Sequence, residues 1–385
     1  ALETKTKMTN TSGEFVFSEM SPSGNYFIKP EKNDNHLNGV STLDLVLIQQ
    51  NILGLKPFTS PYQYLAADAN NDSKVAASDL VELRKLILGH YDRLPKNTSW
   101  RFYEKSQQIQ DPKYPWGLNE SIQCINKSGE QLDNHFIAVK TGDVNISAQA
   151  NTLTNSNEQR TSSGNLFIHD KKFGSDNSVF IPVYAQNIES MAGIQGAFDY
   201  DINSLRFKQM TPGVLNVTKE NYHTYHEDGR ILFSWNVTEN EVSTADQILF
   251  TLEFESTASG QISDVLSLVS DKINSEYYNI DMREYNLRLS YKYPVVDDMM
   301  DVSQNTPNPF ASQTIIPVSI PENGVVQVKI HDNTGKVVLF KSEYFTKGRN
   351  EFIINANDLL TSGIYYYEII YNDQSIKKKM IKIND

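Results

Sequence analysis

The sequence of 385 residues has a single cysteine, Cys124, and no apolar run of the roughly 18 residues that a membrane-spanning helix needs. One cysteine excludes an internal disulfide framework, and a lone thiol is more often a small buried side chain than a nucleophile. The missing apolar run predicts no membrane span. The first residues, ALETKTK, are neither a signal peptide nor an initiator methionine, so we expect the sequence to begin inside a longer precursor.

Positive charge is also in short supply, because 35 Lys and Arg face 47 Asp and Glu, for a net charge of -12 and a pI of about 5.1. Such a chain repels phosphate backbones and suits cations or neutral sugars, so nucleic acid is not an expected partner. No convergent set of acids, bases and nucleophiles is recognisable, and we therefore predict that the protein is not an enzyme. The length predicts two to four domains.

An internal repeat organises the first quarter of the chain. GVSTLDLVLIQQNILGL (39–55) aligns without gaps on KVAASDLVELRKLILGH (74–90), at an offset of 35 residues. Each copy reads as a polar loop, a helix of about ten residues with apolar side chains at helical spacing, and a C-terminal glycine, Gly54 or Gly89. Neither unit can bury a face alone, so the two are expected to pack on one another.

The loop before the second helix, DANNDSKVAASD, has the spacing of a calcium loop. Calcium takes six to eight oxygen ligands, and a twelve-residue loop supplies them from positions 1, 3, 5, 7 (a carbonyl), 9 (through water) and 12. The corresponding residues are Asp68, Asn70, Asp72, Lys74 through its carbonyl, Ala76 through water, and Asp79. Ser73 replaces the usual glycine and Asp79 the usual glutamate. The alternative is an Asx-rich turn that only caps a helix.

The first copy has a poorer ligand set. Counting back from Asp44 places Asn33, Asn35 and Leu37 at positions 1, 3 and 5, so the fifth position has no ligand unless the loop bulges to bring in Asp34. We expect calcium here to be held more weakly, because fewer carboxylates are present. The candidate ligands of this loop are Asn33, Asp34, Asn35 and Asp44.

Duplicated loop–helix units with the string LVELRKLILG resemble a dockerin domain, over residues 32–92. The resemblance implies calcium as cofactor, a non-catalytic module that folds around the ion, and a cohesin-type protein partner.

The residues on either side of this domain carry weaker patterns. Upstream, GEFVFSEMSPSGNYFIKP (13–30) alternates like a β-hairpin and resembles the last strands of a prealbumin-like surface repeat, over residues 1–31. Residues 93–163 are expected to form an extension wrapped over the dockerin core and then a linker; a sugar-stacking role of their aromatics is the alternative. Within them, Asp143-Val-Asn145 has the first ligands of a calcium loop without its later half.

Residues 164–291 change to short alternating strands about ten residues apart, which predicts a β-sandwich. VFIPVYAQNIESMAGIQGAFDYDINSLRF resembles the opening strands of a cohesin-type sandwich, although carbohydrate-binding sandwiches share much of the pattern. An acidic linker is predicted at 292–301.

Residues 302–385 read as a second, smaller sandwich with explicit strands and a final hairpin. PNPF, HDNTGK, SGIYYYEI and the terminal KKKMI resemble the C-terminal sorting domain of type IX secretion substrates in Bacteroidota. This resemblance implies export by the type IX secretion machinery and a secreted or cell-surface location.

Together these patterns predict a multidomain, mainly β fold, with one small α dockerin-like pair and two β-sandwiches of immunoglobulin-like type. The predicted function is calcium-dependent protein–protein assembly or adhesion, including head-to-tail self-association through the dockerin-like and cohesin-like modules. The alternative is a carbohydrate-binding C-terminal portion of a polysaccharide-degrading enzyme, which would grip a polysaccharide through exposed aromatics such as Trp235.

Overall fold

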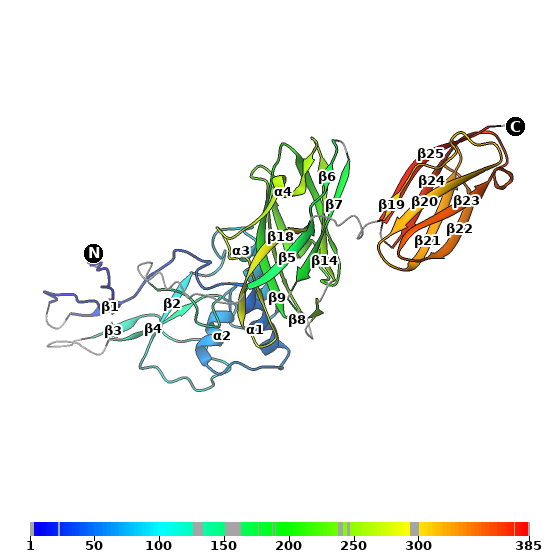
Figure 1. Cartoon of the computed structure of the whole chain (residues 1–385). Helices are drawn as coiled ribbons and strands as arrows, with labels where there is room; N and C mark the ends of the chain where they lie inside the picture. Colours follow the sequence, from blue (N-terminus) through cyan, green and yellow to red (C-terminus); the bar gives the residue numbers. More distant parts are fainter. Residues whose placement is uncertain are drawn as a thin grey trace. The chain divides into compact units, whose positions relative to one another are not determined.

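The chain forms two compact units, residues 1–291 and residues 292–385, seen in the computed structural model of Figure 1. The structure describes residues 4–21, 24–125, 134–150, 163–175, 177–186, 188, 190–237, 242–244, 247–292, 300–372 and 374–383. The fold is mainly β with few helices, as the sequence predicts.

The repeat forms two helices of equal length, α1 (Thr42–Ile52) and α3 (Ala77–Ile87), each of 11 residues. Gly54 and Gly89, with φ of 71° and 69°, follow these helices in the left-handed conformation that ends a helix, as the repeat predicts. The two helices pack on each other.

A third helix, α2 (Pro61–Ala67), was not predicted from the sequence. Ser60 caps it by accepting a hydrogen bond from Tyr62, and proline occupies its first position. Serine followed by proline is a start signal for a helix, so the local sequence did carry the information.

Residues 93–125 and 134–144 form an extension that packs over these helices. Its strands and that of the N-terminal segment form two antiparallel pairs: β1 (Tyr26–Ile28) with β3 (Ile122–Cys124), and β2 (Trp100–Glu104) with β4 (Phe136–Lys140). Helices and extension share one apolar core, which includes Leu45, Ile48, Leu83, Leu86, Leu94, Tyr103, Val139 and Val144.

Within the described part of residues 13–30, no β-hairpin forms. Among the described residues of 13–30, only β1 is a strand, and its partner is β3 in the extension rather than a neighbouring strand. A two-stranded hairpin is marginal in water, so pairing with a distant segment of the same chain satisfies the backbone of β1 instead.

The rest of the first unit is a sheet whose main path runs β10-β14-β7-β5-β18-β17-β9-β12-β11, with β16 beside β9. Its strands are β5 (Ser163–His169), β7 (Ser178–Gln186), β9 (Gly193–Tyr200), β10 (Leu205–Pro212), β11 (Tyr222–Tyr225), β12 (Arg230–Asn236), β14 (Ile248–Ser256), β16 (Leu266–Val269), β17 (Glu276–Tyr278) and β18 (Glu284–Lys292). Short pairs add β6 (Lys172–Phe173) with β15 (Gly260–Gln261) and β8 (Ser190–Met191) with β13 (Val242–Ser243), beside α4 (Ile262–Val265) and a 3₁₀ turn, η1 (Lys219–Asn221).

The sheet folds over a single apolar core, so that its two halves face each other as a sandwich. Phe250 on β14 contacts Phe198 on β9 and Phe233 on β12, with ring centroids 6.3 and 5.6 Å apart. Trp235 also lies in this core and is only 7% exposed.

The second unit is a smaller sandwich, as the sequence predicts, of two sheets around one core. One sheet is β19 (Asp301–Val302), β20 (Gln313–Ile320) and β23 (Gly348–Asn355); the other is β22 (Val337–Phe345), β21 (Gly324–His331), β24 (Gly363–Tyr371) and β25 (Gln374–Lys382), and η2 is Ala356–Asp358. Most of both predicted linkers, 151–162 and 293–299, lies outside the described residues.

Candidate functional site

The predicted calcium loop runs from the end of α2 to the first turn of α3. Asp68 is the C-cap of α2, and its carboxylate accepts hydrogen bonds from the backbone N–H of Asp72 (2.9 Å) and of Ser73 (3.0 Å). Asp79 accepts from the N–H of Asn70 (3.2 Å) and of Ala76 (2.9 Å). The two ends of the loop therefore fold back so that its side-chain oxygens lie together.

Negative charge is concentrated and buried in this loop. Asp68 and Asp79 are both 0% exposed. Burial raises the pKa of Asp79 to about 6, and the charges of Asp68 and Asp72 add to that rise. Among the described residues, no Lys, Arg or His forms an ion pair with any of the three carboxylates. A cation bound in the loop would supply the missing positive charge.

The donor set suits calcium rather than a transition metal. Every candidate ligand supplies oxygen: Asp68, Asn70, Asp72, Asp79 and the carbonyl of Lys74. Within the described ranges, no three His, Cys, Asp or Glu side chains form a metal site by themselves, so amide and carbonyl oxygens would have to contribute, as in calcium loops. Ser73 takes the left-handed conformation of the usual glycine, with φ of 65°.

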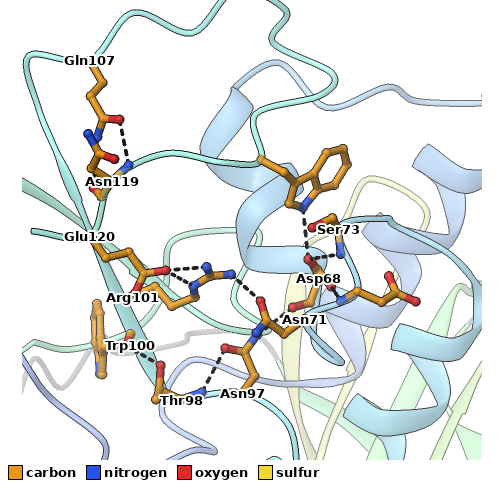
Figure 2. Close-up of polar contacts among 12 residues, drawn as sticks. Asp68, Asn71, Ser73, Asn97, Thr98, Trp100, Arg101, Gln107, Asn119 and Glu120 are labelled. Carbon is orange, nitrogen blue, oxygen red and sulfur yellow. Dashed lines mark hydrogen bonds and ion pairs between the residues drawn. The ribbon is translucent and has the colours of Figure 1, made fainter.

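The extension supports this loop from outside, which the sequence did not reveal (Figure 2). The indole N–H of Trp116 donates to Asp68 Oδ2 at 3.0 Å, and the side-chain amide of Asn97 donates to the Asp68 carbonyl at 2.8 Å. Arg101 donates to Asn71 Oδ1 at 2.9 Å and is paired with Glu120. Trp116 is thus engaged with the loop rather than displayed for a sugar.

The predicted ligands of the first loop have other partners. Asn33 accepts a hydrogen bond from the N–H of Ser99 at 2.9 Å, and Asp34 pairs with Lys32 at the surface. Asn35 begins a turn with φ of 41°. Asp44 is instead 0% exposed at the start of α1, where it accepts from the N–H of Ser41 (2.9 Å) and of Val144 (2.8 Å).

The helical pair lies against the sandwich of the same chain, at β9 and β12 (Figure 1). Thr42 is fully buried there: its N–H donates to Gln195 Oε1 at 2.6 Å, and its hydroxyl is 2.6 Å from that of Ser234. Asn236 on β12 bonds to both helices, through Arg84 on α3 and Gln49 on α1. These pairs fix the orientation of the helices on the sheet.

An apolar cluster completes the same contact. Leu88, at the end of α3, packs with Ala197, Leu232 and Ile273 of the sandwich. The hydroxyl of Tyr225 on β11 donates to the Gly89 carbonyl at 2.5 Å. We call this whole contact, from Thr42 to the Leu88 cluster, the docking interface.

The docking interface contains two histidines, His90 and His223, and we expect it to weaken in acid because of them. His90 and His223 stack with ring centroids 4.1 Å apart. Burial lowers the pKa of both; the charge of Lys85 further lowers that of His90, and those of His90 and His226 further lower that of His223. Both rings are therefore neutral when docked. Their stabilising effect is complete above the ordinary pKa of 6.5 and is lost as pH falls below it toward the lower docked values.

We expect hydrogen exchange in α3 to accelerate between about pH 7 and pH 5 more than the intrinsic exchange chemistry explains. His223→Phe, which keeps a ring without the charge, should reduce this dependence to the share of His90, whereas His226→Phe should reduce it less. An unchanged pH profile in the His223→Phe variant would contradict the assignment.

Comparison with known families places two of these segments. Residues 35–88 match the family model of the dockerin type I domain. The helical repeat is a dockerin-like domain. Dockerin type I domains bind calcium. Residues 306–384 match the model of the secretion system C-terminal sorting domain, so the protein is secreted or lies at the cell surface, as predicted. The dockerin match does not include Asp143 or the strand before it.

Among solved structures, the chain is similar to cohesins and cohesin–dockerin complexes. A type I cohesin–dockerin complex from Clostridium thermocellum shares 16% identity over 34% of this chain and 99% of that chain, with a TM-score of 0.29. A type II cohesin dyad from Acetivibrio cellulolyticus shares 14% over 44% and 61%, with a TM-score of 0.27. A non-cellulosomal cohesin from Archaeoglobus fulgidus shares 16% over 35% and 93%, with a TM-score of 0.26.

No curated protein matches the chain. Dockerin and cohesin-like domains are non-catalytic assembly modules. In the part of the chain that the structure describes, no helix has the length and apolar character to cross a bilayer.

Proposed function

We propose that this protein is a non-catalytic assembly protein, secreted or held at the cell surface, whose calcium-ordered dockerin domain docks on its own cohesin-like sandwich. We further propose that the same docking interface joins subunits head to tail when it forms between two chains. The observation that carries both statements is the packing of α1 and α3 on β9 and β12 within one chain.

The docking interface has the composition of a specific contact. Its apolar centre, Leu88 with Leu232 and Ile273, supplies the burial, and the pairs made by Thr42 and Asn236 leave few buried polar groups without a partner. A like-sized patch without these pairs would hold the helices in more than one orientation.

Docking within one chain is favoured because the tether gives the helices a high effective concentration near the sheet. Exchange of the dockerin domain between two chains keeps every contact and is a form of domain swapping. Because the contact joins two different surfaces, one-way exchange from chain to chain extends a row of subunits, whereas reciprocal exchange between two chains closes a dimer.

Two of the candidate calcium ligands lie on the helices that dock, α1 and α3. The candidate ligands Asp44 and Asp79 lie in the first turns of these helices, which carry Thr42 and Arg84 to the sandwich. When bound, the ion supplies a positive charge among buried carboxylates, and so orders the helices that dock.

The glycan-binding alternative is weakened by the position of its proposed anchor. Trp235 lies in the sandwich core, 7% exposed, because its side chain points inward with those of Ile231 and Phe233. A ring in that position cannot stack on a polysaccharide.

A pair of complementary variants tests docking between chains. Leu232→Asp spoils the sandwich side of the docking interface and Leu88→Asp spoils the helix side, so neither variant can dock within its own chain. Mixed at equal concentration with calcium, each supplies the intact half that the other lacks. We expect a heterodimer of twice 43.7 kDa by mass photometry, absent from either variant alone and dissociated by chelator.

The control is a mixture of Leu232→Asp with Phe180→Asp, a variant altered on a different strand, β7. Phe180→Asp keeps its own interface docked and offers no free sandwich face, so this mixture should stay monomeric. If the complementary pair also stays monomeric while both proteins remain folded, association between chains is wrong.

A further inference from the structure

The segment after β4 is built like the first half of the calcium loop between α2 and α3. Asp143 accepts hydrogen bonds from the N–H of Ser147 (3.0 Å) and of Ala148 (2.9 Å), and Asn145 Oδ1 also accepts from Ser147 (3.1 Å). In the contiguous loop, Asp68 accepts from Asp72 (2.9 Å) and Ser73 (3.0 Å), and Asn70 Oδ1 accepts from Asp72 (3.0 Å). In both segments the residue at position 1 accepts from the N–H groups of positions 5 and 6, and the residue at position 3 accepts from that of position 5.

Backbone conformation matches at the fourth position and burial at the first, third and fifth, whereas at the sixth Ser73 is left-handed and Ala148 is not. The fourth position is left-handed in each, at Asn71 with φ of 58° and at Ile146 with φ of 62°. The first position is buried in each, the third is half-buried and the fifth is exposed. Isoleucine rarely adopts a positive φ, so the surrounding structure, and not the residue type, determines the left-handed conformation of Ile146.

The missing second half of this loop comes from the start of the first repeat. The Ser147 hydroxyl is 3.1 Å from the Gly39 carbonyl, and a Cβ on Gly39 would lie 2.6 Å from the Ala148 backbone. Only glycine allows the two chain segments to approach so closely. Asn38 and Gln149 then join the segments through two side chain–backbone hydrogen bonds of 2.7 and 3.0 Å.

Asp44 closes this arrangement as Asp79 closes the contiguous loop. Asp79 accepts from Ala76 at 2.9 Å and from the first half of its loop at 3.2 Å; Asp44 accepts from Ser41 at 2.9 Å and from Val144 at 2.8 Å, although Val144 is 100 residues away in sequence. Ser41 and Ala76 are equivalent in the repeat.

We propose that these two segments form one discontinuous calcium site, whose ligands are Asp143, Asn145, Ser147, the carbonyl of Gly39, and Asp44. The first dockerin repeat then takes the opening half of its loop from residues 143–148 and not from Asn33, Asp34 and Asn35. The inference rests on the proposed calcium-dependent function. It goes beyond that function by naming the residues that hold a calcium ion in addition to the one in the loop 68–79.

The charges at the site need a cation. Asp44 is 0% and Asp143 5% exposed, and the two carboxylates repel each other. Burial raises the pKa of Asp143, and the charge of the buried Lys140 opposes that rise. The Lys140 ammonium group nevertheless donates to the carbonyls of His36 (2.7 Å) and Thr141 (3.0 Å) and forms no ion pair with either carboxylate. Two carboxylates, an amide, a hydroxyl and a carbonyl give hard oxygen ligands for calcium, with room for water. The contiguous loop has three carboxylates, so the discontinuous site should bind more weakly.

Calcium titration calorimetry of the full chain tests the assignment. We expect two sites. Asp143→Asn should weaken calcium binding at the discontinuous site about tenfold or more and leave binding by the loop 68–79 unchanged. Asp34→Asn, the same change in the uninterrupted loop before α1, should alter binding at neither site. Circular dichroism of each variant in calcium checks that it folds.

A gain of affinity avoids the risk of unfolding altogether. Ser147→Asp places at position 5 the carboxylate that Asp72 supplies in the contiguous loop, and Ser147 is exposed. We expect about tenfold tighter calcium binding at the discontinuous site. Asn35→Asp adds the same charge to the loop that precedes α1 and should have no such effect.

The outcomes separate this inference from the proposed function. If calcium affinity changes in the Asp34→Asn and Asn35→Asp variants but not in Asp143→Asn and Ser147→Asp, the discontinuous site is wrong. Calcium-dependent docking would remain intact. A single site that responds only to changes at Asp68 or Asp72 would do the same. A wild-type chain that binds no calcium would overturn both.

Discussion

Removal of calcium should lower the melting temperature of the first unit by roughly 10–20 °C and leave the second unit unchanged. At a calcium concentration a hundredfold above the dissociation constant, each site stabilises the folded state by about 2.7 kcal/mol. Two sites give about 5 kcal/mol, and each kcal/mol corresponds to about 2–4 °C for a unit of this size. The effect should be large because chelation leaves Asp44, Asp68 and Asp79 buried without a counter-charge.

Differential scanning calorimetry of the full chain, in calcium and then in excess chelator, measures this directly. The second unit serves as an internal reference, because it has its own core and contains no predicted ligand. Asp79→Asn should keep only the part of the calcium response that the discontinuous site supplies, whereas Asp228→Asn, on an exposed turn, should keep the full calcium response. Equal melting temperatures of the first unit with and without calcium would exclude a structural role for the ion.

Local sequence was enough for the elements whose signals lie within one segment. The helix repeat predicted α1 and α3 with their terminal glycines, and alternation predicted the strands of both sandwiches. The loop 68–79 carries all its ligand types in order, so its spacing alone is sufficient to predict the candidate site. The family matches at 35–88 and 306–384 agree with both resemblances.

Pairing between distant segments was not predictable in the same way. Asp143-Val-Asn145 was recognisable as half a loop, but nothing near it in sequence showed that Val144 would bond to Asp44 and Ser147 to Gly39. Counting back from Asp44 takes for granted an uninterrupted loop, which the discontinuous site that we propose is not. The same limitation explains the N-terminal hairpin, because the partner of β1 lies in β3.

The docking interface did leave a trace in the sequence. In β12, RILFSWN, Ile231, Phe233 and Trp235 lie on one face, and the other face carries one apolar residue, Leu232, among polar ones; β9 contains Gly193, Gly196 and Ala197. A large apolar residue on the second face favours a cover there, and small residues allow a helix to approach. A Cβ on Gly193 would lie 3.2 Å from Thr42 Cγ2. These features say that β9 and β12 are covered, although they do not say by which segment.

Leu232→Asp should release the dockerin domain from the sandwich without unfolding either. Leu232 is 1% exposed and lies on the side of β12 that faces Leu88, opposite to Ile231 and Phe233 in the sandwich core. A carboxylate there would be buried beside Ala197 and Ile273 with no cationic partner, at a cost of several kcal/mol. Undocking avoids this cost, because it returns the carboxylate to water.

Hydrogen exchange on the variant distinguishes release from unfolding. The N–H of Thr42 donates to Gln195 across the docking interface, so its protection should fall about a hundredfold or more, while the amides of β7 and β14 in the sandwich keep theirs. Phe180→Asp, the same change at a residue 49% exposed on β7, should leave the exchange of Thr42 as in the wild type. If Thr42 stays protected in Leu232→Asp, or if the strands of the sandwich lose protection with it, then the contact is not a separable docking interface and exchange between chains has no structural basis.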